Sequence, residues 1–169
     1  MTKREAAQPI GVDATGYKVL TRAVLELLES FPGLGDNEIR FEELGAKSGI
    51  AFSADAGALV MSERRSITDH VVQTCQYPFF VVYRTSSSRE YQKLYVQDFM
   101  DTLGKWLCKE PAEINGETIR LYNYPKLAEG RRITRITRSN SYGLTPTEDG
   151  VQDWLMPVVV EYTNEFDMW

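Results

Sequence analysis

The chain has 169 residues, of which 43% are hydrophobic and 25% are charged, and its formal net charge is −5. This balance is typical of a globular protein and excludes an intrinsically disordered chain. The negative charge argues against a dedicated nucleic-acid binder, which usually carries a basic domain or a basic face. A chain of this length buries about two thirds of its unfolded surface. We therefore expect one domain over 1–169, with 1–15 as a flexible or partner-docked arm.

The chain carries no pattern typical of secretion or of a membrane span. Its charged start, Met1-Thr2-Lys3-Arg4-Glu5, is not followed by an apolar segment. No stretch reaches the roughly 18–20 apolar residues that a membrane span requires. The sequence therefore predicts a protein made in the cytoplasm, without a membrane partner.

The first half of the chain predicts one helix and two short strands. Apolar residues recur at spacings of three and four from Tyr17 to Phe31, and Pro32-Gly33 ends this helix. Short strands are expected over 39–41 and 58–61. The glycine- and serine-rich stretch 45–57 predicts loops and turns.

The middle of the chain predicts a central strand followed by a long helix. The region 71–85 starts with Val71-Val72, and its stretch 77–83 is nearly all apolar, with β-branched and aromatic residues, so we expect a strand covered on both faces. Pro78 lacks an N–H and should lie at the beginning of this strand or at a bulge. A helix is expected over 89–108, starting after three serines. Its apolar stripe comprises Tyr91, Leu94, Tyr95, Phe99, Leu103, Trp106 and Leu107.

The last third predicts three strands. Asn115-Gly116 is a turn signal before a strand over 118–122. Strands over 131–138 and 154–162 follow, joined by the polar segment 139–149. We expect this segment to project like a finger and to contact an adjacent subunit or another protein. Strands in series favour an α+β fold, with a mostly antiparallel sheet flanked by two helices and a long C-terminal β-hairpin.

The residues that could carry catalysis favour a structural role. His70 is the only histidine, and Asp69 precedes it. Adjacent residues in an extended segment point to opposite faces, so Asp69 is poorly placed to orient His70 as a general base. Cys75 and Cys108 lie beside apolar runs, which favours buried, inert thiols over a disulfide or a nucleophile. We therefore expect no enzyme and no catalytic residue.

Cofactor and metal sites are not expected either. A zinc site needs about four ligands in close spacing, and the chain has one histidine, two cysteines and no C-x-x-C motif. Gly33-Leu34-Gly35 lacks both the preceding strand and the third glycine of a dinucleotide-binding loop. The P-loop motif is missing from the sequence as well.

The strand over 131–138 is the most distinctive group of charges. Simple alternation places Arg131 and Arg135 on one face and Arg132 and Arg138 on the other. They could contact phosphates, but the net negative charge favours pairing with acidic residues of this chain or of a neighbour. The apolar C-terminal tail is costly to expose and should also dock on this or another subunit. The candidate interface residues are Arg131, Arg132, Arg135, Arg138, Tyr142, Leu144, Trp154, Phe166 and Trp169.

The order of these signals over 76–166 resembles the tail-terminator or minor capsid proteins of tailed phages, which join head and tail. The residues that carry the resemblance are the strand Tyr77-Pro78-Phe79-Phe80-Val81-Val82-Tyr83, the turn Ser88-Arg89-Glu90, the helix bearing Phe99 and Trp106-Leu107, the strand Ile133-Thr134-Arg135-Ile136-Thr137, the loop Ser141-Tyr142-Gly143 and the strand Trp154-Leu155-Met156-Pro157-Val158-Val159-Val160-Glu161-Tyr162. Segments 1–15 and 45–57 have no counterpart in the family.

The resemblance implies a small α+β virion protein, assembled in the host cytoplasm, that forms a ring on the head-proximal end of a phage tail. The ring is usually a hexamer, and it stops polymerisation of the tail tube. The implied partners are further copies of the chain, the tail tube protein and the neck or head-completion proteins. DNA passes through such a ring without specific binding. The alternatives are another neck, connector or minor capsid protein, or an uncharacterised small enzyme.

Overall fold

A computed structural model describes residues 17–55, 58–86, 89–128 and 130–168. The expected arm over 1–15 and the candidate residue Trp169 lie outside these ranges. The helices are α2 (Tyr17–Glu29), the short 3-10 helix η1 (Pro32–Leu34) and α3 (Glu90–Leu107). The strands are β1 (Ile39–Phe41), β2 (Gly49–Ala54), β3 (Leu59–Arg65), β4 (His70–Thr85), β5 (Ala112–Ile114), β6 (Glu117–Ile119), β7 (Arg131–Arg138), β8 (Tyr142–Gly143) and β9 (Gln152–Asp167).

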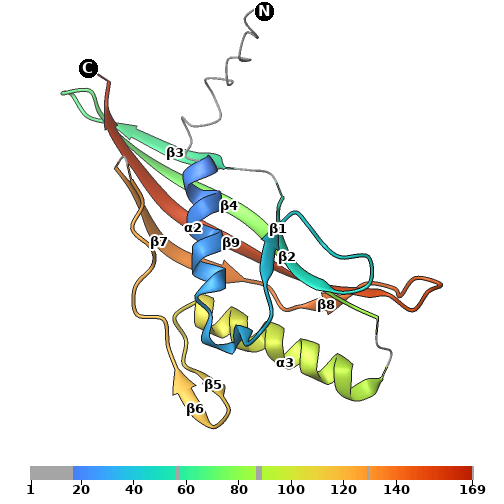
Figure 1. Ribbon diagram of the computed structural model, residues 1–169. Helices are drawn as coiled ribbons and strands as arrows, with labels where there is room; N and C mark the ends of the chain where they lie inside the picture. Colours follow the sequence, from blue (N-terminus) through green and yellow to red (C-terminus); the bar gives the residue numbers. More distant parts are fainter. Residues whose placement is uncertain (1–16, 56–57, 87–88, 129, 169) are drawn as a thin grey trace, which may run out of the picture.

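The sheet is built around two long strands, β4 and β9, which run through the whole molecule (Figure 1). Each has 16 residues, and the two pair antiparallel from His70↔Asp167 to Thr85↔Gln152. The outer edge of β4 pairs first with β3 and then with β2, and the outer edge of β9 pairs with β7 and with β8. Strand β1 adds to β2 in parallel. The fold is therefore α+β with a mostly antiparallel sheet and a C-terminal hairpin, as the sequence predicted.

Each long strand contains one proline, and both lie where the outer partner changes. Pro78 lies between the β3-paired and β2-paired stretches of β4, and Pro157 lies between the β8-paired and β7-paired stretches of β9. The carbonyl of Pro78 accepts from the N–H of Asp55 at 3.1 Å, and that of Pro157 accepts from Ser139 at 2.9 Å. The missing N–H of each proline faces the same outer edge, where no ladder partner needs it. Of the two places expected for Pro78, the beginning of the strand was wrong, since Pro78 lies inside β4 at the change of outer partner.

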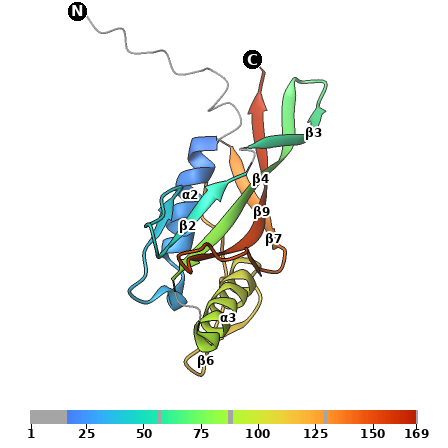
Figure 2. The same ribbon diagram turned by 90° about the vertical axis from the view of Figure 1, so that its right-hand side faces the viewer.

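Both long helices cover the same face of the sheet, as Figures 1 and 2 show. The two helices and alternate residues of β4 and β9 share one apolar core. Phe31, which follows α2, joins the helices because its ring contacts the rings of Phe99 and Trp106 on α3. On the sheet, the hydroxyl of Tyr77 lies 2.9 Å from that of Thr21 on α2. The residues of α2 and α3 that are buried in the core are Leu20, Ala23, Val24, Leu27, Leu28, Val96, Phe99, Met100, Leu103, Trp106 and Leu107.

The first turn of α3 departs from the predicted stripe. Tyr91, Leu94 and Tyr95 are exposed, whereas Val96 and Met100 are fully buried. A helix rotates by about 100° per residue. This rotation puts Val96 and Met100 on the same face as the later buried residues and leaves Leu94 on nearly the opposite side.

Several predicted segment bounds needed correction. Segment 45–57, expected to be loop, contains β2, in which Ile50, Ala51 and Phe52 are buried. The predicted strand 118–122 is shortened to β6, which pairs with the unpredicted β5. The Asn115-Gly116 turn between them is confirmed, since both residues have the positive φ angles of a tight hairpin (52° and 80°). Strands β4 and β9 extend well beyond the apolar stretches that indicated them.

Consecutive phenylalanines on β4 test the two faces of the sheet. Phe79 is buried against the rings of Phe52 and Tyr77, so Phe79→Ala should lower the free energy of unfolding by about 3–5 kcal/mol. Phe80 points away from the helices and is partly exposed, so Phe80→Ala should cost about 1 kcal/mol. Urea denaturation of dilute protein measures both. Equal losses would contradict the one-sided packing.

Candidate assembly surface

The face of the sheet that points away from the helices is apolar at its centre. We call this surface the open face. Paired residues of an antiparallel sheet share a face, and the central pairs here are Pro78↔Val159, Phe80↔Pro157 and Val82↔Leu155. All six side chains are partly exposed.

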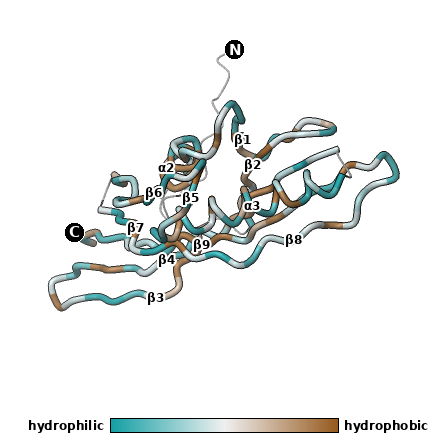
Figure 3. Tube along the Cα trace, turned by 90° about the horizontal axis from the view of Figure 1, so that it is seen from below, coloured by the Kyte–Doolittle hydropathy of each residue, from teal (hydrophilic) through white to brown (hydrophobic). Residues whose placement is uncertain are grey.

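The described elements leave the centre of the open face uncovered, although Leu44 and Leu144 border its end at Val82 and Leu155. In Figure 3 the helices, β5 and β6 all lie on one side of β4 and β9, and no described helix lies on the other side. An antiparallel sheet with one solvated face normally carries polar residues there. The sequence predicted that the central strand would be covered on both faces, but within the described chain only one face is. A contiguous apolar surface of this kind is typical of a protein–protein contact.

Charged pairs frame the apolar centre of the open face. At one end, Arg84 donates to both carboxylate oxygens of Asp153, at 2.7 and 2.9 Å. At the other end, Arg135 donates to both oxygens of Glu161, at 3.1 Å each. An apolar centre with a polar rim is the usual composition of a protein interface.

The four arginines of β7 do not alternate as the sequence predicted. The β7–β9 register shifts between Ile133 and Arg135, so one extra residue lies in β7. As a result Arg132 and Arg135 lie on the open face, whereas Arg131 and Arg138 lie on the helix face. The prediction that Arg131 and Arg135 lie on one face was therefore wrong, because a one-residue shift reverses the side of every later side chain.

Arg131 and Arg138 have structural roles within the subunit. Arg131 is only 8% exposed, and its charge lowers the pKa values of the Cys75 thiol and the Tyr162 hydroxyl, although burial raises both overall. Arg138 crosses over Gly104 of α3, where a Cβ atom would overlap its side chain. Its guanidinium then donates to Asp101 at 3.2 Å. These two charges are therefore removed from the candidate interface.

The remaining candidate residues divide into buried and exposed. Trp154 is buried in the core, on the helix face of β9. Tyr142 and Leu144 are 45% and 46% exposed, and Tyr142 pairs with Leu155 at the edge of the open face. Phe166 is also exposed, at the far end of β9. The open-face residues of β4 and β9 were not among the predicted interface residues, although their alternation with the apolar core positions was the available signal.

His70 forms ion pairs across the two long strands. Its Nδ1 lies 2.8 Å from Asp167, and its Nε2 lies 3.6 Å from Glu165. The hydrogen bond to Asp167 is the main reason that the pKa of His70 is raised. Asp69 is turned to Arg65 instead, at 2.6 Å. Because both ring nitrogens face carboxylates of β9, the imidazole joins β4 to β9.

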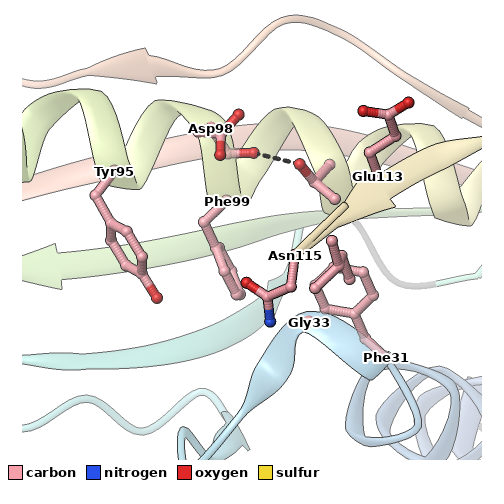
Figure 4. Close-up of a pocket in the computed structure, with 9 residues that line it drawn as sticks. Phe31, Gly33, Tyr95, Asp98, Phe99, Glu113 and Asn115 are labelled. Atoms are coloured by element: carbon pink, nitrogen blue, oxygen red, sulfur yellow. Dashed lines mark hydrogen bonds between the residues drawn. The ribbon is translucent and has the colours of Figure 1, made fainter. Parts of the chain in front are cut away.

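A pocket of about 240 Å³ lies between α3, Phe31 and β5 (Figure 4). Tyr95 and Phe99 present their rings to it, and Glu113 and Asp98 lie at its border. No cysteine, serine or histidine is among the residues that line it. Its lining combines aromatic rings with carboxylates, which can hold an apolar or cationic group.

The two cysteines are free thiols, as the sequence predicted. Cys75 is buried and Cys108 is partly buried, and burial raises the pKa of each thiol. A raised pKa makes a thiol less reactive at neutral pH. Among the described residues, no group of three or more His, Cys, Asp or Glu side chains is placed to hold a metal ion.

Comparisons with known proteins do not assign the chain to a family. No model of a known protein family matches the sequence, and no curated protein matches it either. The helices in the described part of the chain are too short or too polar to cross a membrane.

Two arginines of β7 are expected to differ in their effect on stability, because Arg138 contacts α3 and Arg132 is exposed. Arg138→Ala should lower the free energy of unfolding by about 1–3 kcal/mol, because the partly buried pair with Asp101 is lost. Arg132→Ala should change it by about 0.5 kcal/mol or less, because Arg132 is exposed. Urea denaturation of both variants measures the difference. A loss for Arg132→Ala as large as that for Arg138→Ala would contradict the assignment of Arg138 as a brace.

His70 should titrate above its ordinary pKa of about 6.5. Because the folded-state pKa is raised, the ion pairs stabilise the fold fully below that ordinary value, and the stabilisation is lost as the pH rises through the raised value. Proton NMR of the single imidazole measures the midpoint. Asp167→Asn should lower the midpoint toward 6.5. An unchanged midpoint in that variant would show that Asp167 does not hold the ring.

Proposed function

We propose that the chain is a structural protein of a tailed phage, a tail-terminator subunit that forms a hexameric ring. The ring caps the head-proximal end of the tail tube and joins it to the neck proteins. The observation that carries the proposal is the open face, with three apolar pairs across the central strands and no described helix over them. Contact with further copies would remove this surface from water.

The shape of the sheet supports assembly through two unlike surfaces. A ring closes when one surface of each copy meets a different surface of the next. Strands β4 and β9 extend past the helices toward β3 at one end and toward the 144–151 turn at the other (Figure 1). The subunit therefore offers two different projections, as head-to-tail contact requires.

The charge of the chain supports passage of DNA through the ring without specific binding. The formal net charge is −5. Within the described part of β7, only Arg132 and Arg135 of the four arginines lie on the open face, and Arg135 is held by Glu161. A wall with few uncompensated cations gives little phosphate affinity. The partners proposed for the ring are accordingly proteins: the tail tube protein and the neck or head-completion proteins.

Charging the centre of the open face should abolish assembly. Phe80→Lys places an ammonium group in the apolar centre, where ring formation would bury it without a partner. In a phage that lacks the wild-type gene, this variant should give tails of uncontrolled length that do not join heads, seen by electron microscopy. Tyr122→Lys is the control, because Tyr122 is the same kind of exposed aromatic residue but lies off the sheet.

Circular dichroism verifies that Phe80→Lys still folds. Normal virions from phage carrying Phe80→Lys would overturn the assignment of the open face to the ring. Normal tails from phage with the gene deleted would overturn the tail-terminator function. Labelling of purified particles with antibody separates this function from another neck protein, since a terminator must lie on tails that have not yet joined heads.

A further inference from the structure

Strand β3 is an open edge of the sheet. All seven of its residues are exposed, and among the described strands it pairs only with β4. Together with the adjoining stretches 70–76 of β4 and 161–167 of β9, it forms a ribbon that extends past the helices (Figures 1 and 2). A free strand edge is a template for pairing with another chain, and proteins usually shield it.

The hydrogen-bond pattern shows which backbone groups of the ribbon face outward. The N–H of Ser66 donates to His70 at 2.9 Å, which makes Ser66↔His70 a hydrogen-bonded pair. Such pairs alternate along an antiparallel ladder with pairs whose backbone groups point away from the partner. In this register the N–H and C=O groups of Glu63 and Arg65 point outward from β3. They are available to a further strand.

The side chains of β3 also favour a partner. Leu59, Val60 and Met61 are three consecutive exposed apolar residues, and Ile67 is fully exposed at the tip of the ribbon. Such a run is unusual on a free surface. Two of its three charged side chains have partners within the ribbon, since Glu63 accepts from Gln73 at 2.8 Å and Arg65 pairs with Asp69.

A second open edge lies at the opposite corner of the sheet. Strand β8 pairs only with β9 among the described strands, and Tyr142 and Leu144 beside it are exposed. Strand β3 adjoins the beginning of β4, whereas β8 adjoins the beginning of β9, at the other end of the antiparallel pair. The ladder of β3 ends at Gln76 and that of β8 lies level with Val82, so about six residues at about 3.3 Å each, or roughly 20 Å, separate the two along the strands, and they lie on opposite edges of the sheet. The two edges therefore cannot meet within one chain.

We propose that the β3 edge of one copy pairs with the β8 edge of the next copy, so that one sheet continues from subunit to subunit. Each copy then uses one edge as donor and the other as acceptor, and both runs of exposed apolar residues are covered. The proposal rests on the ring of the proposed function and adds a contact between strand edges, which is separate from the burial of the open face. Backbone pairing supplies affinity in strand addition, and the alternate side chains supply specificity.

A proline at an outward N–H tests the pairing. Glu63→Pro removes one outward donor and leaves the β3–β4 ladder intact, because that N–H does not face β4. Glu63→Ala is the matched control, which removes the same side chain and keeps the N–H. By analytical ultracentrifugation, Glu63→Pro should weaken self-association at least tenfold and Glu63→Ala less than threefold. Equal association of the two variants would overturn the proposal.

Cross-linking identifies the partner edge without relying on the proline variant. Ser62 and Tyr142 both lie on the open face, opposite Thr74 and Leu155. With Cys108→Ser as background, the double variant Ser62→Cys, Tyr142→Cys and a short bismaleimide should give a ladder of multimers. Each single variant should stay monomeric on the gel. A Ser62→Cys chain that cross-links to itself would show two-fold β3 pairing and overturn the proposal, as would a double variant without a ladder.

The two proposals fail separately. Phage tails capped normally by a protein that gives no ladder would overturn the strand pairing and leave the ring function standing. A clear ladder from a protein whose deletion leaves tails normal would overturn the tail-terminator function and leave the strand pairing standing.

Discussion

The pairing of β4 with β9 over their full 16 residues is the interaction on which the rest of the molecule depends. Each strand is too long to be covered by one neighbour, so each has two successive partners on its outer edge. Pro78 and Pro157 are tolerated only because they lie at the changes of partner. The same length carries the sheet past the helices at both ends and creates two separate projections.

The two faces of this sheet differ in what covers them. Two helices and the hairpin of β5 and β6 lie on one side, and they give the buried core. The other side keeps apolar pairs such as Phe80↔Pro157. Burial of apolar surface contributes about 25 cal/mol per Å², and a stable interface removes about 800 Å² from each partner. A contact of that size, repeated from subunit to subunit, accounts for an apolar face whose exposure to water is unfavourable in a monomer.

The sequence predicts those parts of the molecule that repeat one pattern over many residues. The alternation in 154–162 identified β9, and the apolar run in 77–83 identified β4 as a central strand. Their polar extensions were missed because pairing with neighbouring strands, and not apolar alternation, holds those residues extended. Strand β2 was missed because Gly45, Gly49 and Gly57 around it are typical of loops.

The candidate surface was harder to predict, because it depends on long-range register. Alternation alone could not reveal the bulge in β7 that separates Arg131 from Arg135 and turns Arg138 onto α3. Trp154 and Phe80 each appeared as a large apolar residue in a strand, and only the position of the helices distinguishes the buried one from the exposed one. That distinction changes the candidate interface from the arginines to the apolar centre of the sheet.

The central claim is that the open face is buried in the working assembly. Hydroxyl-radical footprinting with mass spectrometry measures the solvent exposure of single side chains in dilute and in assembled protein. The account predicts that Phe80 and Leu155 are oxidised in the dilute chain and protected several-fold on assembly, whereas the exposed Tyr122 stays reactive in both. Equal oxidation of Phe80 in the dilute and assembled protein would contradict the account.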